Sequence, residues 1–290
     1  MKIAITGSSG FVGRQAARIL SDAGHVLYLY DVRHHDDPAG KSIFPIIGNL
    51  ITGEGLSLVP WNELDIVVHL AAAGVKASHR RWAECLQVNV TGTQQLLEHL
   101  RSVENPPRLV YARTFYENHL NVPALSENPY VATKRTASDL IRIYQCMTGA
   151  PVTSATLYQA YGPGDDVGNV LSYIVNQLRR SQAALLGSGK GLRDWIYIDD
   201  LVAGLVSIIT APVGDYDLGS GKLYSLKSVA WKIADLMEAD RSLLEFGKER
   251  DRGDSEIIDQ AENFIPGWEP SCSLNEGLAK MIEAMKDDAV

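Results

Sequence analysis

The sequence predicts a doubly wound α/β fold, a parallel sheet covered by helices on both faces, with a smaller α/β lobe in its second half. In the first half, short apolar runs alternate with longer amphipathic stretches, and after about residue 160 this order becomes less regular and glycines become denser. Strands and helices in alternation need right-handed crossovers, which produce a parallel sheet. With 290 residues, 46% of them apolar, the chain can bury an ample core.

Four apolar runs of the first half are expected to be buried strands. They are KIAIT (2–6), HVLYLYD (25–31), DIVVHLA (65–71) and RLVYA (108–112). The segments 11–24 and 83–102 between them have apolar residues three and four positions apart, which is typical of helices. A further helix is expected to begin near Tyr130.

The second half has helical patterns at 200–210, 225–240 and 274–286, separated by glycine-rich stretches such as YGPGDD and LGSGKGLRDW. We therefore expect one domain at 1–160 and a smaller lobe at 161–290, interleaved with the first. The sequence has no internal repeat and no low-complexity tract.

Composition excludes several classes of function. A net charge of -8 argues against a nucleic-acid binder, because duplex affinity comes mainly from lysine and arginine. The three cysteines form no C-x-x-C pair, which fits a reducing cytoplasm and no zinc site. No apolar run approaches the roughly 20 residues that span a bilayer. We expect a cytoplasmic protein with no membrane, nucleic-acid or metal partner.

Gly7, Gly10 and Gly13 follow the first expected strand and open the first expected helix. At such a junction the backbone turns sharply and points helix N-terminal amides at a pyrophosphate. An acidic residue, Asp31, ends the next strand, and its carboxylate can accept hydrogen bonds from the adenosine ribose and repel a 2'-phosphate. NAD is therefore favoured over NADP, although Arg33, two residues later, could bind the 2'-phosphate of NADP.

Tyr130 and Lys134 are spaced i,i+4 at the start of a helix, so their side chains share one face. A free tyrosine has a pKa of about 10, and a nearby cation favours the phenolate. We expect Lys134 and the positive ring of an oxidised nicotinamide to lower the pKa of Tyr130 jointly. Thr114, at the end of the strand before, could hold the substrate oxygen, which makes Thr114, Tyr130 and Lys134 a triad for hydride-transfer chemistry.

The sequence resembles the extended short-chain dehydrogenase/reductases, the NAD-dependent epimerase/dehydratase family that acts on nucleotide sugars. The matching segments run nearly end to end: TGSSGFVG (6–13), HLAA (69–72), VNVTGT (88–93), YVATK (130–134), YGPG (161–164), GSGKGLRDWIYIDD (187–200), RGD (252–254) and GWEP (267–270). This resemblance implies a Rossmann sheet and a nucleotide-diphosphate sugar as substrate.

The resemblance also implies roles for single residues. Those expected to bind the cofactor are Gly7, Gly10, Phe11, Val12, Gly13, Asp31, Arg33, Asn49, Leu50, Leu70, Ala71, Ala72, Asn89, Tyr130 and Lys134. For Asn89 the resemblance allows two roles, a structural one and contact with the cofactor. Gln159, Arg193 and Arg252 are expected to contact the substrate, because the planar fork of arginine suits a diphosphate.

Other side chains have more ordinary interpretations. His34, His35, Asp36 and Asp37 are consecutive, and consecutive residues rarely converge on one metal ion. His69 is expected to be a satisfied core histidine, and Trp195 and Tyr197 to fill a core. Asp199 and Asp200 are expected to cap and orient the following helix.

Of the activities in this family, the one we favour is an NAD-dependent epimerase acting at a sugar hydroxyl, commonly C4. The nearest alternative is a 4-keto-sugar reductase that uses the same triad in one direction. A 4,6-dehydratase ranks third, because Phe115 and Tyr116 follow Thr114 where that subgroup has acidic residues, and Glu117 is out of that pattern. A non-catalytic reader of NAD(H) is a fourth possibility. The corresponding family helices pair in a dimer, so we also expect a homodimer.

Overall fold

The computed structural model describes residues 1–33, 42–76, 80–119, 121–122, 125, 127–249 and 257–287. Its centre is a seven-stranded sheet in the order β10-β6-β5-β4-β1-β2-β3, and every neighbouring pair in it is parallel. The strands are β1 (Lys2–Thr6), β2 (Val26–Asp31), β3 (Ile43–Ile47), β4 (Ile66–His69), β5 (Arg108–Thr114), β6 (Val152–Leu157) and β10 (Asp215–Leu218). The predicted parallel sheet is confirmed.

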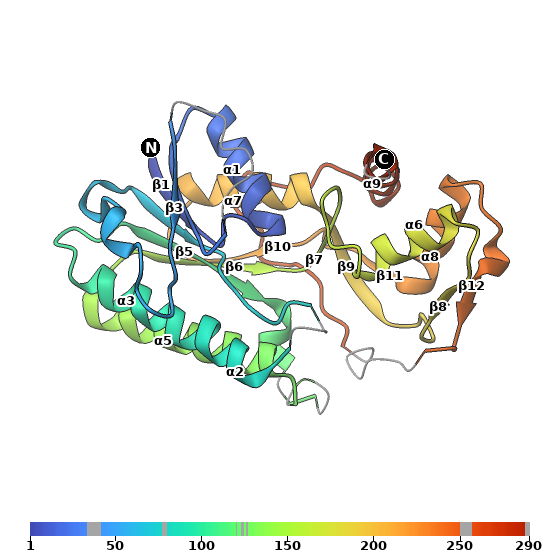
Figure 1. Cartoon of the computed structure of the whole chain (residues 1–290), viewed down its shortest axis with the longest axis horizontal. Helices are drawn as coiled ribbons and strands as arrows, with labels where there is room; N and C mark the ends of the chain where they lie inside the picture. The colour runs from blue at the N-terminus through green and yellow to red at the C-terminus, as the bar shows by residue number, and fades with distance from the viewer. Residues whose placement is uncertain are drawn as a thin grey trace.

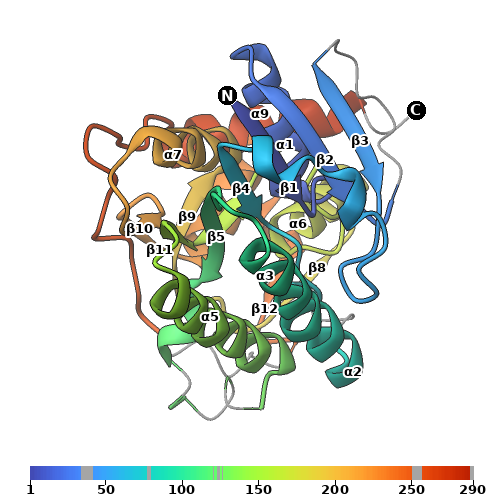
Figure 2. The ribbon, with the colours of Figure 1, turned by 90° about the vertical axis from the view of Figure 1, so that its left-hand side faces the viewer.

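Helices cover both faces of this sheet. Figure 1 shows α1 (Phe11–Asp22) and α7 (Ile198–Thr210) on one face of the sheet. It shows α2 (Trp82–Cys85), α3 (Thr93–Arg101) and α5 (Pro129–Thr148) on the other face. The view in Figure 2 shows the same two layers, with α3 and α5 side by side. The doubly wound arrangement follows from the alternation of strand and helix in the sequence.

The four predicted strands are confirmed as β1, β2, β4 and β5, with ends that differ by up to two residues. β5 continues to Thr114, which is therefore the last residue of a strand, as expected. β3 and β6 were not among the predicted strands. β3 contains Pro45 and lies at the edge of the sheet, where a residue without an N–H is tolerated.

The predicted helix at 83–102 is interrupted. The chain forms α2 (Trp82–Cys85), then a π-helical segment η4 (Leu86–Gly92), then α3 (Thr93–Arg101). π-helical turns are rare and occur frequently at functional sites. Here the wider turn includes Asn89, whose side chain reaches out of the helix to the loop after β4.

α5 (Pro129–Thr148) has clear start and stop signals. The Asn128 side chain caps its first turn by accepting the Tyr130 N–H at 3.1 Å, and Pro129 occupies the first turn. Gly149 ends the helix with a left-handed φ of 70°. These signals put Tyr130 at the second position of the helix.

The second half forms a smaller lobe at one end of the sheet (Figure 1). Its elements are β7 (Gln159–Tyr161), α6 (Val170–Arg179), β8 (Ala184–Leu186), β9 (Leu192–Tyr197), β11 (Leu223–Ser225), α8 (Leu226–Leu236), β12 (Leu244–Phe246) and α9 (Leu274–Asp287). β11, β9 and β7 form one small sheet, and β12 pairs with β8. Short 3-10 helices complete the described elements: η1 (Leu56–Leu58), η2 (Trp61–Glu63), η5 (Phe115–His119) and η6 (Arg241–Leu243).

Two elements of the second half of the chain belong to the large sheet and its covering helices. β10 pairs with β6 at the edge of the large sheet, and α7 packs on α1. The chain thus leaves the large sheet after β6, begins the small lobe, and returns. A boundary at residue 160 remains a prediction.

Several ordinary interpretations can be compared with the structure. His69 is buried, and its ring nitrogens lie 2.7 Å from the Thr6 hydroxyl and 3.0 Å from the Thr93 hydroxyl. Trp195 and Tyr197 are buried in the main core. Asp200 lies inside the first turn of α7 and accepts hydrogen bonds from the Ser271 hydroxyl and the Cys272 N–H, so it anchors the chain ahead of α9. His34 to Asp37 lie outside the described residues.

No helix in the described part of the chain is both long and apolar enough to cross a bilayer.

Candidate active site

The candidate site lies at the carboxyl edge of the large sheet. β1 has β2 on one side and β4 on the other. Successive strands are therefore added outward from β1 in one direction as far as β3 and in the opposite direction from β4 onward, so the strand order reverses at β1. In open α/β sheets ligands bind at such a reversal, beyond the carboxyl ends of the strands. Gly7 follows β1, Leu70 follows β4, and Thr114 ends β5, so these predicted residues share one edge.

The glycine-rich turn is closely packed. Gly7 has a left-handed φ of 72°, and a Cβ built on it would lie 2.6 Å from the backbone of Ala71. A Cβ on Gly13 would lie 2.3 Å from the Gly7 carbonyl oxygen. Only glycine fits either position. The backbone is therefore bare where a dinucleotide pyrophosphate would approach, and the turn fits NAD.

Asp31 lies beside this turn. Its carboxylate accepts the Ser9 N–H at 2.9 Å and the Arg33 N–H at 3.1 Å, and the residue is 8% exposed. An acid held against the glycine-rich turn suits the ribose of an adenosine. The Arg33 side chain is exposed. We expect Asp31 to favour NAD.

The remaining predicted cofactor residues line the same edge. Phe11, Val12, Leu70, Ala71 and Ala72 are all partly exposed around the turn. In the loop after β3, the Asn49 side chain accepts the Ile51 N–H at 2.9 Å, and Leu50 is buried in the second core cluster. Their contact with a cofactor remains a prediction.

Asn89 holds the loop after β4 to α5. Its amide oxygen accepts the Ala73 N–H at 2.8 Å, and its amide nitrogen donates to the Ala73 carbonyl at 3.0 Å and to the Thr133 hydroxyl at 2.9 Å. Asn89 is 1% exposed. These bonds fix the distance between the cofactor edge and the helix that carries Tyr130.

Tyr130 and Thr114 meet where β5 ends and α5 begins. The Thr114 hydroxyl lies beside the Tyr130 phenol, close enough to lower its pKa. The Tyr130 ring packs against a small apolar cluster that includes Phe115, Tyr158 and Ile257, residues from three separate parts of the chain. The phenol therefore lies between the end of β5 and the residues around Ile257.

The chain's own groups raise the pKa of Tyr130. Burial raises the pKa of its phenol, the charge of Glu117 raises it further, and Thr114 lowers it. The expectation that Lys134 and the positive ring of an oxidised nicotinamide lower this pKa jointly remains a prediction, because it requires the charge of the cofactor beside the phenol. Additional positive charge is needed before Tyr130 can act as a base near neutral pH.

Lys134 lies on α5, one turn after Tyr130, and its side chain packs against β5. It is 5% exposed, its ammonium donates to the Ala112 carbonyl at 2.7 Å, and its Nζ lies 4.6 Å from the centre of the Tyr111 ring. Burial lowers the pKa of Lys134 to about 8, although the charge of Glu117 raises it. Lys134 is thus held against β5, one helical turn from Tyr130.

The predicted substrate residues come from the small lobe. Gln159 begins β7, is partly exposed, and pairs with Trp195 of β9. Arg193, also in β9, donates to the Leu192 carbonyl at 2.6 Å and to the Ile257 carbonyl at 3.3 Å. Arg252 lies outside the described residues. A role in substrate binding remains a prediction for all three.

Sequence reasoning gave no role to two ionisable side chains of η5. Glu117 is buried directly after β5. His119, at the end of η5, lies 2.6 Å from the Asp259 carboxylate, which also accepts the Tyr158 hydroxyl at 3.0 Å. The position of Glu117 three residues after Thr114 was the only signal, and it was judged against the dehydratase pattern alone.

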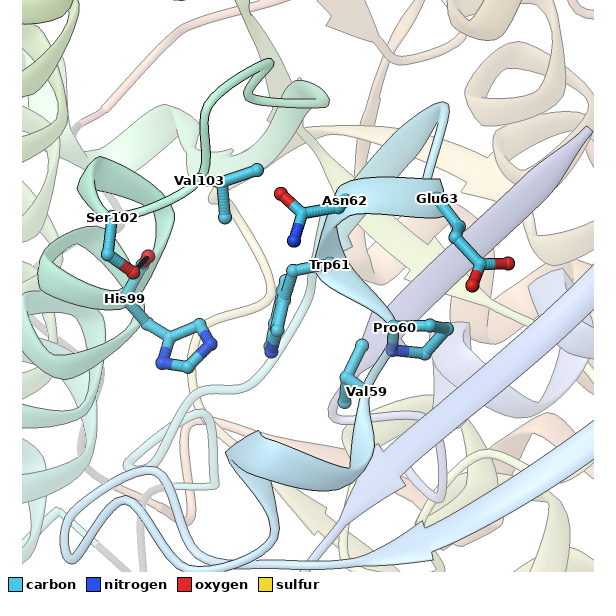
Figure 3. Close-up of a pocket in the computed structure, with 8 residues that line it drawn as sticks. All are labelled: Val59, Pro60, Trp61, Asn62, Glu63, His99, Ser102 and Val103. Atoms are coloured by element: carbon cyan, nitrogen blue, oxygen red, sulfur yellow. Dashed lines mark hydrogen bonds between the residues drawn. The ribbon is translucent and has the colours of Figure 1, made fainter.

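A separate hollow of about 230 Å³ lies at Trp61 and His99 (Figure 3). It is formed by η2, which precedes β4, and by the end of α3, which precedes β5. It therefore opens at the amino edge of the strands, opposite the candidate site. Its position gives it no part in chemistry at Tyr130.

Known proteins share this fold. The solved structure of MoeE5 in complex with UDP-glucuronic acid and NAD superposes with a TM-score of 0.84, at 24% identity, over 99% of this chain and 100% of that one. At this level of identity the likeness shows the fold alone.

Curated relatives cover most of the chain. It is 24% identical to a UDP-N-acetyl-alpha-D-glucosaminuronate decarboxylase of Bacillus cytotoxicus, over 98% of this chain and 97% of the relative. It is 29% identical to a UDP-glucuronate 4-epimerase of Thermodesulfobacterium geofontis, over 78% of this chain and 74% of the relative. The model of the NAD dependent epimerase/dehydratase family matches residues 3–219, which is most of the chain. With its glycine-rich turn, Tyr130 and Lys134 in the expected places, this chain belongs to the NAD dependent epimerase/dehydratase family.

Proposed function

We propose that this protein is an NAD-dependent epimerase of a nucleotide-linked sugar, acting at C4. The observation that carries the proposal is that the Thr114 hydroxyl lies beside the Tyr130 phenol at the carboxyl end of β5, with Lys134 one turn along α5. Two neighbouring hydroxyls can both bond a sugar oxygen placed between them. Redox chemistry at a sugar hydroxyl needs such a site.

Each residue of the triad has a separate task. Thr114 orients the sugar hydroxyl, and Tyr130 takes its proton on oxidation and returns it on reduction. Lys134, one turn along α5, would act together with the positive ring of bound NAD to favour loss of the phenolic proton. When bound, NAD supplies the hydride acceptor, and then the donor, at its nicotinamide ring.

The turn around Gly7 and the carboxylate of Asp31 would hold the cofactor. A backbone that passes 2.6 Å from the place of a missing Cβ leaves no room for a larger residue at Gly7. We propose that Asp31 binds the adenosine ribose and that Leu70 to Ala72 form the floor of the site.

For the substrate we propose a UDP-sugar, with UDP-glucuronate and UDP-glucose as the first candidates. Relatives whose names include UDP-glucuronate support the choice, and Arg193 and Gln159 would contact the nucleotide diphosphate and the sugar. Dehydration ranks lower because the Glu117 carboxylate is buried and bonded within the protein, at the Thr114 N–H and Arg113. Phe115 and Tyr116 carry no acid.

We further propose a homodimer formed through α2, η4 and α5. Four large apolar side chains on these elements are exposed: Trp82 (58%), Leu86 (51%), Ile143 (52%) and Met147 (66%). Burying such side chains in a second copy would be favourable. Size-exclusion chromatography with light scattering should give about twice the chain mass of 31.7 kDa at micromolar concentration.

The test of function has two steps. The purified protein is denatured, and any released cofactor and ligand are identified by mass spectrometry; the proposal predicts NAD. The native protein is then incubated with UDP-glucuronate or UDP-glucose, and the products are separated by chromatography and identified by NMR. A C4 epimer formed without added cofactor supports the epimerase. Release of carbon dioxide and a UDP-pentose would instead identify a decarboxylase, and consumption of NADH with a 4-keto sugar would identify a reductase.

A further inference from the structure

Glu117 is a buried acid beside the triad. Its side chain is fully buried, in η5, three residues after Thr114. Burying a carboxylate is costly unless its oxygens are hydrogen-bonded or paired with a charge. The contacts that compensate this burial therefore indicate what Glu117 does.

Both oxygens of the Glu117 carboxylate are bonded. Oε1 accepts the N–H of Thr114 at 3.0 Å. Oε2 accepts the Ser138 hydroxyl and lies 3.3 Å from Nε of Arg113. Thr114 and Arg113 end β5, and Ser138 lies on α5 one turn after Lys134. One side chain thus joins the strand and the helix that together carry the triad.

The contacts continue from Ser138 to Lys134. The Ser138 hydroxyl lies 2.7 Å from the Tyr111 hydroxyl, which lies 3.1 Å from the carbonyl oxygen of Lys134. The Lys134 ammonium in turn lies over the ring of Tyr111. Glu117 is therefore connected through the Ser138 and Tyr111 hydroxyls to the backbone carbonyl of Lys134 and to the ring that its ammonium faces.

The charges around Lys134 oppose one another. The charge of Glu117 raises the pKa of Lys134, whereas Arg113 lowers it, as does burial. The other titratable groups that face Lys134 are Tyr111, under its ammonium, and His69, whose pKa the lysine lowers. Around the phenol of Tyr130 the charged or titratable neighbours are Glu117, Tyr116 and Arg80. Glu117 is the carboxylate common to both groups.

We propose that Glu117 is a positioning residue of this site: its bonds to Thr114, Arg113 and Ser138 fix the end of β5 against α5, and its buried carboxylate is the counter-charge for the ammonium of Lys134. Its effect on Lys134 is independent of any substrate. Its effect on turnover rests on the proposed function. The two parts can be tested separately.

The first test measures Lys134 directly. Protein labelled with 13C at the lysine ε-carbon is titrated by NMR between pH 6 and 11, and the Lys134 signal is assigned with Lys134→Met. In Glu117→Gln, which keeps the shape but not the charge, the Lys134 midpoint should fall by about one pH unit, because an opposite charge nearby shifts a pKa by that order. In Glu117→Asp the Lys134 midpoint should fall less, because this variant keeps the negative charge. The control Asp139→Asn removes an exposed carboxylate from the same helix and should leave the midpoint unchanged.

Arg113→Met provides a test of opposite sign. It removes the cation that lowers the pKa of Lys134, so the midpoint should rise. This variant also decides the question if Glu117→Gln does not fold. A Lys134 midpoint that stays at the wild-type value in Glu117→Gln, or that fails to rise in Arg113→Met, would overturn the proposal.

The second test measures turnover. In Glu117→Gln the alkaline limb of the profile of kcat/KM against pH should move to lower pH by the same amount as the Lys134 midpoint. A purely structural role would lower kcat/KM equally at every pH, and that result would also overturn the proposal. A moved NMR midpoint in a protein that turns over no nucleotide sugar would leave Glu117 as the residue that charges Lys134 and refute the proposed function instead.

Discussion

The Thr114 hydroxyl lies beside the Tyr130 phenol across the junction of β5 and α5 and lowers the pKa of that phenol. One is the last residue of a strand of the large sheet, and the other is the second residue of a helix that covers it. Because the strand end and the capped helix start are both rigid, the two hydroxyls are held in place before any substrate arrives. Such preorganisation is what a proton-transfer site needs.

Replacing Tyr130 with phenylalanine should abolish most turnover. The variant keeps the ring that packs in the apolar cluster but loses the oxygen that moves the proton, which is worth about 100- to 10,000-fold in rate. Bound NAD, measured after denaturation, should be unchanged. Tyr28→Phe, on β2 with its ring stacked on Phe44, is the matched control and should keep full activity. Equal activity in both variants would exclude Tyr130 from the chemistry.

Gly7→Ala should weaken cofactor binding and stability more than Gly149→Ala. Both positions have a left-handed φ, 72° and 70°, so both variants suffer a backbone cost of about 1–2 kcal/mol. A Cβ on Gly149 would meet nothing within 4 Å, whereas one on Gly7 would overlap the Ala71 backbone. Thermal unfolding and titration calorimetry with NAD measure the two effects. If the two variants behaved alike, the close packing of the glycine-rich turn would have no consequence.

Lys134→Met should change how stability depends on pH. The pKa of Lys134 is lowered to about 8 in the folded protein from an ordinary 10.5, so between these values the unfolded chain binds more protons and wild-type stability rises with pH. At 1.36 kcal/mol per pH unit, burying the charged lysine costs about 3 kcal/mol at neutral pH. The free energy of unfolding of Lys134→Met minus that of wild type should therefore fall by about 2 kcal/mol from pH 7.5 to 9.5. Urea unfolding at the two pH values measures this difference, and a constant difference would contradict the buried charge.

The contact between His119 and Asp259 should stabilise the junction between η5 and the small lobe. Both side chains are largely buried, 25% and 19% exposed, and their nearest atoms are 2.6 Å apart. A double-mutant cycle of His119→Ala and Asp259→Ala should give a coupling energy of about 1–2 kcal/mol at pH 6. The exposed pair Lys286 and Glu283, at 60% and 72%, is the control and should couple by less than about 0.5 kcal/mol. Equal coupling in both cycles would mean that the contact does not hold the lobe.

The sequence was informative where local chemistry decides the structure. Apolar alternation predicted β1, β2, β4 and β5, and Asn128, Pro129 and Gly149 are recognisable start and stop signals for α5. β3 was missed because Pro45 argues against a strand, and only its place at the edge makes it possible. The interruption of the helix at 83–102 depends on a contact between Asn89 and Ala73 that no local pattern reveals.

The candidate site was predictable in its parts but not in its electrostatics. Thr114, Tyr130 and Lys134 could be chosen from spacing and resemblance. The burial of Glu117 could not, because glutamate is usually exposed and its partners Thr114, Arg113 and Ser138 come together only in the folded chain. For the same reason the sequence did not reveal that burial and the charge of Glu117 raise the pKa of Tyr130.

The most direct test of redox chemistry at Tyr130 uses a sugar nucleotide that carries deuterium at C4. The substrate found by the product assay is prepared in this form and converted in ordinary water, and deuterium at C4 of the epimer is measured by NMR. Removal and return of hydride within one closed site predicts that the deuterium stays at C4, with turnover slowed relative to the unlabelled substrate and lost in Tyr130→Phe. Deuterium replaced by solvent hydrogen, or turnover that survives in Tyr130→Phe, would contradict the account.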